Sequence, residues 1–360
     1  MIISAKPSPS IGALFSKVEK IDTQQLIFFS HGRYALLECI KNFKLKKGDG
    51  IVIPAYMCNS TLEPIRKFGL KIFYVDVNKN LTPSIETIKK ISKRETIKAL
   101  LLVNYFGFEL DTEAIFQFCR DNKVKIIEDF SHSFYSNLFT SVDFMKSDAQ
   151  IFSLRKNLPV QDGGVLKLPD SSHLESNKLS CCNFLDNFLY LTKRLVEFLA
   201  ISMQFNIYSQ RITYLRASKT QSLFFDVKSC MPSWNLLKYI GNKQYLSRSK
   251  EITLSNFKEL CNVLNQLQFK ILKYDLNKDE IPQALVLFNP GGNFLSYLRA
   301  NGIGAWSWPA EEMPLEVLQD RKNYPNANYF NQSLVLVPIH QSVSKRKIDY
   351  IKQVFSRWKN

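Results

Sequence analysis

Two stretches of the chain decide the expected fold: IIEDFSHSFYS at residues 126–136 and SDAQIFSLRKNLPVQDGG at residues 147–164. Each contains a short apolar run that stops at polar residues. Such a run, bounded by polar or glycine residues, is typical of a buried β-strand. The second stretch ends in a Gly-Gly step before the next apolar run. We therefore expect these runs to be strands of one sheet.

Chemically active side chains follow both runs. Glu128, Asp129 and His132 follow the first, and Ser153 and Lys156 follow the second. In open α/β sheets, ligands bind in the crevice outside the carboxyl ends of the strands. The sequence therefore predicts two carboxylates, an imidazole, a hydroxyl and an amine at the ligand-binding edge of the sheet.

The alternation of apolar runs with amphipathic stretches extends from about residue 27 to residue 168. This rhythm indicates an α/β architecture with a largely parallel sheet. The expected strands are 50–53, 71–75, 99–103, 124–128, 149–153 and 164–168. The expected helices between them are 34–42, 59–68, 84–91 and 112–122.

The rest of the chain has a different pattern. Residues 171–260 are mostly helical by pattern and rich in Lys and Arg, while the last part, from 270 on, returns to α+β. We expect a large domain over 1–245 with a helical insertion at about 171–230, and a smaller α+β domain over 246–360. The expected elements of the smaller domain are a strand at 284–288, a helix at 295–301, a strand at 333–338 and a helix at 345–359.

The composition is that of a folded protein with an excess of positive charge. The 360 residues are 45% apolar and 22% charged, which argues against disorder over most of the chain. The 48 Lys and Arg outnumber the 32 Asp and Glu by 16. A charge of this sign suits nucleic acid, a membrane surface or a small polyanionic substrate. No run of basic and aromatic residues follows one element, as nucleic-acid modules usually show.

The seven cysteines and the chain's start bear on its location. The cysteine count is odd, with no paired spacing, as expected of reduced thiols in a cytoplasmic protein, and no metal site is expected. The first residues, with Lys6 and two prolines, do not resemble a signal peptide. No stretch approaches the roughly 20 apolar residues of a membrane span. The apolar residues of 185–211 recur at helical spacing, which fits a packed helix or dimer contact better than a membrane-surface helix.

Lys156 can carry covalent chemistry if its pocket is partly desolvated. An amine near another cation in such a pocket has a lowered pKa and becomes nucleophilic, so Lys156 could form a Schiff base. Asp129 could then keep a cofactor's ring nitrogen protonated, which makes the ring an electron sink. The plainer alternative is that Asp129 caps a loop and Lys156 is a solvated lysine.

Five segments in this order resemble the DegT/DnrJ/EryC1/StrS family of fold-type I pyridoxal 5'-phosphate (PLP) enzymes. The segments are HGRYALLECI at 31–40, GDGIVIPAYMCNSTLEPIRKFGLKIFYVDV at 48–77, LLLVNYFGFELD at 100–111, IIEDFSHS at 126–133 and FSLRKNLPVQDGG at 152–164, and a weaker match, LVPIHQSVS, lies at 336–344. The resemblance implies a large domain with a mostly parallel sheet, a smaller C-terminal α+β domain and a homodimer.

The resemblance also implies the roles of three residues. Lys156 would form the internal aldimine with PLP and shuttle protons in transamination, because the pair Gly163-Gly164 follows it at the family's usual offset. Asp129 would pair with the pyridine nitrogen of PLP. His132 would lie beside the phenolic oxygen of the cofactor, although a lone histidine is more often structural.

The cofactor phosphate would bind at the start of the helix that follows His31. Gly32 would allow close approach there, the backbone N–H of Arg33 would contribute, and Ser153 would add its hydroxyl. Where most family members carry an aromatic ring that stacks on the cofactor, this chain has Cys58, so either Tyr56 supplies the ring or a smaller group covers that face.

Three further departures mark an outlying branch. Arg33 stands where the family has Ser or Thr, and the spacing from Ser153 to Lys156 is two residues shorter than usual. The family's asparagine-arginine segment, through which a neighbouring subunit touches the phosphate, is not found, and Asn235 is a weak candidate for it.

Three functions follow as hypotheses. The first is a PLP-dependent aminotransferase that makes an amino sugar from a keto sugar, carried on a nucleotide, with glutamate as the amino donor. The second is another PLP reaction, such as sugar dehydration or amination of a non-sugar carbonyl. The third is a non-catalytic basic binding protein, motivated by the net charge.

Overall fold

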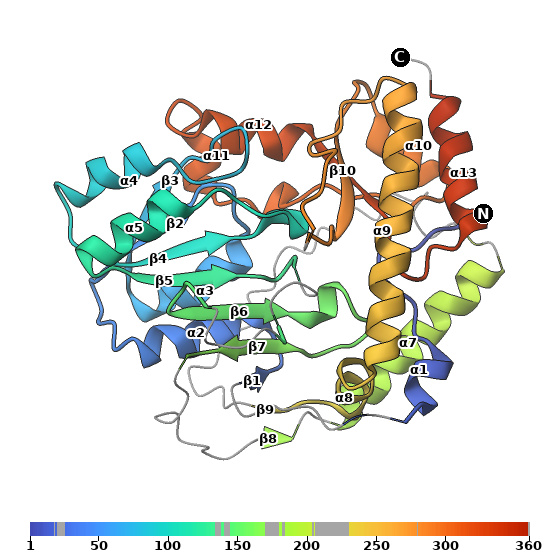
Figure 1. Cartoon of the computed structure of the whole chain (residues 1–360), viewed down its shortest axis with the longest axis horizontal. Helices are drawn as coiled ribbons and strands as arrows, with labels where there is room; N and C mark the ends of the chain where they lie inside the picture. The colour runs from blue at the N-terminus through green and yellow to red at the C-terminus, as the bar shows by residue number, and fades with distance from the viewer. Residues whose placement is uncertain are drawn as a thin grey trace.

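A seven-stranded sheet organises the amino-terminal half of the chain (Figure 1). This computed structural model describes residues 1–17, 19, 26–133, 138–139, 145–169, 180–181, 184–203, 205, 230–278 and 280–358. The strand order across the sheet is β1-β7-β6-β5-β4-β2-β3. In chain order the strands are β1 (Leu26–Phe29), β2 (Gly50–Pro54), β3 (Lys71–Val75), β4 (Ile97–Val103), β5 (Lys125–Asp129), β6 (Ala149–Ser153) and β7 (Gly164–Lys167).

The directions of the strands create one functional edge. β2 pairs in parallel with β3 and β4, β4 with β5, and β5 with β6. β7 is antiparallel to both β6 and β1. The carboxyl ends of β1 to β6 therefore lie at the same edge of the sheet, and β7 begins there. Open α/β sheets bind their ligands at this edge.

Helices cover both faces of the sheet because its strands are apolar on both sides. Along β4, Leu101 packs into the cluster that contains Leu36, whereas its neighbour Leu100 packs into the cluster that contains Ile88. Successive side chains of a strand point to opposite faces, so a continuous apolar run needs cover on both. The covering helices are α2 (Gly32–Asn42) and α3 (Asn59–Phe68) on the first face and α4 (Ile85–Ser92) and α5 (Glu113–Asn122) on the second.

The C-terminal part has its own small sheet and apolar cluster. β10 (Ala284–Phe288) pairs antiparallel with β11 (Leu334–Pro338). The helices of this part are α9 (Lys243–Gln266), α10 (Phe294–Ala300), α11 (Leu315–Gln319), α12 (Pro325–Ser333) and α13 (Lys345–Ser356). Figure 1 shows α9 passing from this part along the side of the large sheet, next to α8 (Trp234–Ile240).

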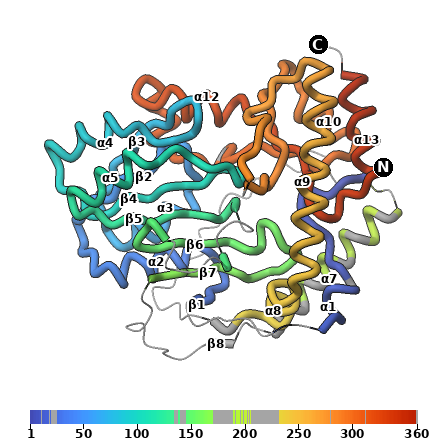
Figure 2. The backbone as a smooth tube through the Cα atoms, in the orientation of Figure 1, coloured from blue at the N-terminus to red at the C-terminus, as the bar shows by residue number. Residues whose placement is uncertain are grey.

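Within the described part of the chain, the first residues form backbone hydrogen bonds with the C-terminal part and not with the seven-stranded sheet. The N–H of Ile3 donates to the carbonyl of Gly302, and its own carbonyl accepts from the N–H of Gly304, each at 2.8 Å. The Ile3 side chain is fully buried in a cluster with Val337. Figure 2 shows the amino terminus beside α13 accordingly.

The predicted α/β architecture and the order of its elements are confirmed. The expected segments 71–75, 149–153 and 284–288 are β3, β6 and β10, and 59–68 is α3. The remaining expected strands and helices are present with ends shifted by up to three residues. Among the features that were not predicted are the short strand β1, the pairing of β8 (Ser180–Cys181) with β9 (Cys230–Met231), and the helices α11 and α12.

Part of the predicted helical insertion lies outside the described residues. α1 (Ile11–Phe15), α7 (Phe184–Ser202), α8 and α9 are described, whereas 170–179 and 206–229 are not. Within the described residues, no helix combines the length and apolar character that a membrane span requires.

Two backbone segments approach each other closely where β7 starts. A Cβ atom on Gly164 would lie 2.2 Å from the carbonyl carbon of His31 and 2.7 Å from the nitrogen of Gly32. Gly164 is paired with Phe29 of β1 on one side and with Ser153 of β6 on the other. The absence of a side chain at Gly164 thus lets the chain leave β1 and enter α2 directly over the end of β6.

We predict that Gly164→Ala lowers the free energy of unfolding by at least about 2 kcal/mol, because backbone atoms cannot move aside as a side chain can. Urea or thermal denaturation measures this change. The matched control is Gly12→Ala in α1, where a Cβ would meet nothing within 4 Å. The control should be within about 1 kcal/mol of the wild type. Equal behaviour of the two variants would contradict the packing described here.

Candidate active site

The residues predicted to carry chemistry follow the carboxyl ends of the parallel strands. Cys58 follows β2, Asp129 ends β5, and His132 lies in the turn after it. Ser153 ends β6, and Lys156 ends the short 3-10 turn that follows. The sheet therefore brings side chains from distant parts of the sequence to one edge, as the strand pattern predicts.

The start of α2 lies against the ends of β5 and β6. A Cβ on Gly32 would be 3.2 Å from the carbonyl oxygen of Phe152, 3.5 Å from the Cβ of Ser153 and 3.7 Å from the Oγ of Ser131. The first N–H groups of an α-helix have no acceptor within the helix, and the helix dipole is positive there. Gly32 and two seryl side chains thus form a small cradle suited to an anion.

Asp129 is a buried carboxylate held by the backbone. Its side chain is 6% exposed. Oδ1 accepts a hydrogen bond of 2.8 Å from the N–H of Ser131, and the Asp129 carbonyl accepts one of 3.0 Å from the N–H of Asn104. These contacts fix the carboxylate at the end of β5, where its negative charge acts on Lys156.

His132 is a buried neutral imidazole held between two aromatic rings. Its ring stacks on Phe106 at 5.6 Å and meets the edge of Trp308 at 4.9 Å. The backbone N–H of Phe106 donates to Nδ1 at 3.3 Å, which leaves the proton of the neutral ring on Nε2. Burial, and secondly the positive charge of Lys156, lower the pKa of His132 well below its ordinary value. His132 is thus a hydrogen-bond donor through Nε2.

The amine of Lys156 is partly buried, and both positive and negative groups lie near it. Desolvation is the largest cause of its lowered pKa, and the charge of Arg155 acts in the same direction. Asp129 and Cys58 oppose the shift. An amine in this setting loses its proton more readily than a solvated lysine, as a nucleophile requires.

Two predicted site residues, Arg33 and Cys58, interact with neighbouring side chains. The Arg33 guanidinium lies 3.3 Å from Oε2 of Glu63 and over the ring of Tyr34. The thiol of Cys58, at the amino end of α3, lies 3.2 Å from the hydroxyls of Ser60 and Thr61.

Tyr56 and Asn235 belong to packed parts of the structure. Tyr56 is fully buried, its hydroxyl donates to the carbonyl of Trp308, and its ring packs on Tyr105 and Trp308. Asn235 is buried in α8. The Tyr56 ring is thus committed to the core, which favours the alternative in which a smaller group covers the cofactor face.

Sequence reasoning missed the contacts that join the site to the rest of the chain. The carboxylate of Asp162 accepts from the N–H and the hydroxyl of Ser233, at 2.8 and 2.7 Å, and so fixes the turn before Gly163. The contact of Trp308 with His132 comes from the C-terminal part. Neither residue lies near its partner in sequence, so no local pattern could reveal these pairs.

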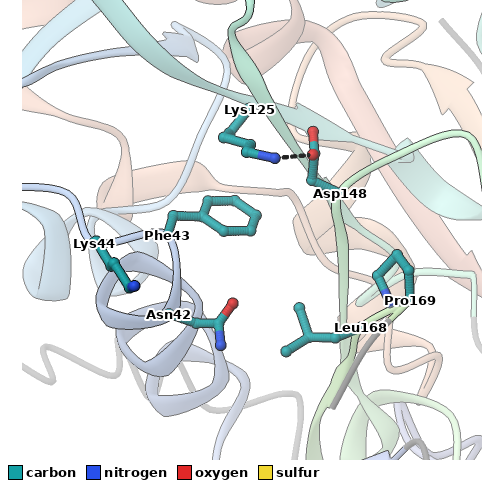
Figure 3. A pocket seen from close by; sticks show the side chains of 7 residues that line it. All are labelled: Asn42, Phe43, Lys44, Lys125, Asp148, Leu168 and Pro169. Carbon is teal, nitrogen blue, oxygen red and sulfur yellow. Dashed lines mark hydrogen bonds and ion pairs between the residues drawn. The ribbon is translucent and has the colours of Figure 1, made fainter. Parts of the chain in front are cut away.

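A hollow elsewhere on the sheet is separate from these residues. Its volume is about 380 Å³. Figure 3 shows the side chains that line it, among them Lys125 and Asp148. Lys125, at the start of β5, forms an ion pair of 2.6 Å in it with Asp148, just before β6. These residues lie at the amino ends of the parallel strands, opposite the candidate site. In the described part of the chain, no three His, Cys, Asp or Glu side chains gather closely enough to hold a metal ion.

We predict that His132 does not titrate between about pH 8 and pH 5, because its pKa is depressed by burial. NMR of the imidazole nitrogens checks this, with His132→Gln assigning the signal. The neutral Nε2–H form should persist throughout. A transition near the ordinary histidine value of about 6.5 would contradict the geometry.

The same burial makes stability depend on pH. The unfolded chain takes up a proton on His132 below about pH 6.5 that the native protein does not, so the unfolding free energy falls with pH by up to about 1.4 kcal/mol per unit from this group. The burial of His31 and His340, whose pKa values fall to about 3 and about 4, acts in the same sense. His132→Gln should show a shallower slope than the wild type in denaturation from about pH 6.5 to 5. Identical slopes would contradict a neutral His132.

Comparison with characterised proteins shows partial sequence similarity. A 153-residue segment is 27% identical to a dTDP-4-dehydro-2,3,6-trideoxy-D-glucose 4-aminotransferase of Saccharopolyspora spinosa and covers 42% of this chain and 40% of that protein. A 96-residue segment is 32% identical to a GDP-4-keto-6-deoxy-D-mannose 3-dehydratase of Yersinia pseudotuberculosis and covers 26% of this chain and 24% of that protein. The chain thus matches less than half of the length of either relative.

The fold is similar over nearly the whole chain. A provisionally assigned sugar aminotransferase from Streptococcus pneumoniae, solved in its PLP form, superposes with a TM-score of 0.70 at 15% identity, over 99% of this chain and 98% of that one. A model of the DegT/DnrJ/EryC1/StrS aminotransferase family matches residues 17–183, which include the sheet edge from Gly32 to Lys156. The family model covers less than half of the chain, so residues 17–183 are similar to this family. The whole chain has the α/β fold of the fold-type I aminotransferases.

Proposed function

We propose that this protein is a PLP-dependent aminotransferase that makes an amino sugar from a nucleotide-linked keto sugar, with glutamate as the amino donor. The observation that carries the proposal is the setting of Lys156. Its partly buried amine shares one sheet edge with the buried carboxylate of Asp129 and the anion cradle at Gly32. The match of residues 17–183 to the family model supports the proposal that this sheet edge is the active site.

The residues fit the cofactor. A Cβ at Gly32 would make close contact with Phe152. The absence of a side chain at Gly32 suits the approach of a phosphate to the start of α2. Two buried nitrogen atoms beside it, Nδ1 of His31 and Nε of Arg155, have no hydrogen-bond partner within the described residues. Buried polar atoms without partners are rare in folded proteins, so a ligand is the natural partner here.

Each side chain would then have one task. Gly32 and Ser153 would bind the phosphate, Asp129 would hold a proton on the pyridine nitrogen, and Nε2 of His132 would donate to the phenolic oxygen. The backbone N–H of Arg33 and the small side chain of Cys58 complete the expected contacts. PLP, when bound, supplies an electron sink for negative charge on the substrate carbon that carries the transferred nitrogen.

Lys156 would act twice. Its side chain would hold the cofactor covalently at this edge of the sheet. When Nζ is free and carries no proton, it would accept the proton that the substrate carbon loses and later donate it. The lowered pKa suits both tasks, because each needs an amine without its proton.

The cations near Lys6 support an anionic substrate. Arg155 and Arg194 both act electrostatically on Lys6 of the amino-terminal segment. Desolvation by burial is the largest cause that lowers the pKa of Lys6 to about 8, and these two arginines act in the same direction. The two curated relatives are named for dTDP-linked and GDP-linked sugars, whose diphosphates a positive charge would attract.

Further features of the proposal come from the family alone. We propose a cytoplasmic homodimer with a large domain over 1–245 and a smaller one over 246–360, with neither a metal nor nucleic acid as partner. A second candidate function is dehydration of a nucleotide-linked sugar, which the similarity to the Yersinia pseudotuberculosis dehydratase favours.

We predict that borohydride treatment in the presence of PLP attaches the cofactor to Lys156 and that Lys156→Ala prevents the attachment. Peptide mass spectrometry identifies the modified residue. Asp129→Asn should still become labelled, since the covalent bond does not need the carboxylate. Labelling of another lysine in the wild type would refute the assignment, and a protein that takes up no PLP would favour a non-catalytic binding protein.

We predict that glutamate alone converts bound PLP to pyridoxamine phosphate with release of 2-oxoglutarate. Absorbance and mass spectrometry follow the two products. Asp129→Asn should slow this conversion by about 10²-fold or more, because the ring nitrogen then loses its charged partner. A protein that binds PLP but reacts with no amino donor would favour dehydration or another PLP reaction.

A further inference from the structure

Within the described residues, Arg155 of the candidate site has no acidic partner. It lies between Ser153 and Lys156 in the 3-10 turn Leu154–Lys156. Its Nε is buried and makes no hydrogen bond, and among the described residues no carboxylate forms an ion pair with its guanidinium. The other strong cations nearby differ in this respect, because Arg33 pairs with Glu63 and Arg194 with Glu197.

Burial and several neighbouring groups influence the pKa of Arg155. Desolvation and the charge of Arg33 lower the pKa of Arg155. Tyr190, Glu312 and Cys58 act in the other direction, but Glu312 is exposed and the other two are ordinarily neutral. Arg155 and Arg33 in turn help burial to lower the pKa of His31 to about 3. His31 is the residue that precedes α2.

The turn Leu154–Lys156 brings Arg155 near the anion cradle. Arg155 lies two residues after Ser153, whose Cβ is 3.5 Å from the position of a Cβ on Gly32 at the start of α2. The electrostatic effect of Arg155 on His31, the residue that precedes α2, agrees with this position. A partly desolvated guanidinium near the positive end of a helix dipole is unfavourable unless an anion neutralises it.

We propose that Arg155 binds the phosphate of the cofactor, so that one chain completes the phosphate site without an arginine from a second subunit. The guanidinium would supply charge-assisted hydrogen bonds, and the start of α2 and Ser153 would supply the others. The inference rests on the proposed function, because it needs PLP at this edge. The phosphate of a substrate is the other candidate partner, and the test separates the two.

The experiment compares PLP with pyridoxal, which has the same ring and aldehyde but no phosphate. Absorbance titration gives the dissociation constant of each for the wild type, Arg155→Met, Arg155→Lys and the control Arg120→Met. Arg120 is an exposed arginine of α5 that pairs with Glu113. The wild type must bind PLP first, and its failure to do so would overturn the proposed function itself.

Arg155→Met should weaken PLP binding by about 10- to 100-fold, the range for loss of hydrogen bonds to a charged group. Pyridoxal binding should not change, Arg155→Lys should recover part of the loss, and Arg120→Met should match the wild type. Equal weakening of PLP and pyridoxal would overturn the proposal, because the phosphate would then not be the partner. Unchanged PLP affinity with a raised KM for the anionic sugar would also overturn it and assign Arg155 to the substrate.

Thermal unfolding without PLP gives a second, independent readout. Since Arg155 lies among cations, Arg155→Met should leave the free protein at least as stable as the wild type. Inorganic phosphate should raise the melting temperature of the wild type more than that of the variant. A less stable variant that responds normally to phosphate would show a structural role and contradict phosphate binding.

Discussion

The site depends on one close contact between backbone segments. His31 and Gly32 lie where a side chain of Gly164 would be, with the His31 carbonyl carbon 2.2 Å from the position of a Cβ. This contact seats the start of α2 on the β6–β7 pair, opposite Ser153. Without it, the helix dipole and the turn that carries Arg155 and Lys156 would not meet, and the chain would lose its anion cradle.

Burial then sets the charge states around this contact. His132 is held neutral as an Nε2 donor, and the pKa of Lys156 is lowered by the same loss of solvent. The carboxylate of Asp129 is the group that most strongly opposes the loss of the lysine proton. The site therefore combines a fixed donor, a fixed acceptor and an amine that can change its protonation state, which is the combination proton transfer needs.

Local sequence patterns predicted the parts of the fold that depend on local periodicity. The apolar runs at 50–54 and 149–153 form strands that are buried at every position and covered on both faces. The approach of Gly32 to Ser153, expected from the family resemblance, is present because Gly32 opens the helix after β1 and Ser153 ends β6, with only the start of β7 between the two strands. The short strand β1 was missed because four residues give too little pattern.

Long-range contacts could not be read from the sequence. Trp308 reaches His132, Ser233 holds Asp162, and Ile3 joins the cluster around Val337, and each pair is far apart in the chain. Arg155 is a related case: its position next to Lys156 is evident from the sequence, but only the structure shows that no carboxylate of the described residues forms an ion pair with it. The specific features of this chain thus lie in tertiary contacts.

The most direct measurement is a crystal structure of the protein soaked with PLP. The account predicts the phosphate at the start of α2, within hydrogen-bonding distance of the Gly32 N–H and the Ser153 hydroxyl, with the ring bonded to Nζ of Lys156 and its nitrogen facing Asp129. A phosphate bound away from α2, or a ring bonded to a different lysine, would contradict it.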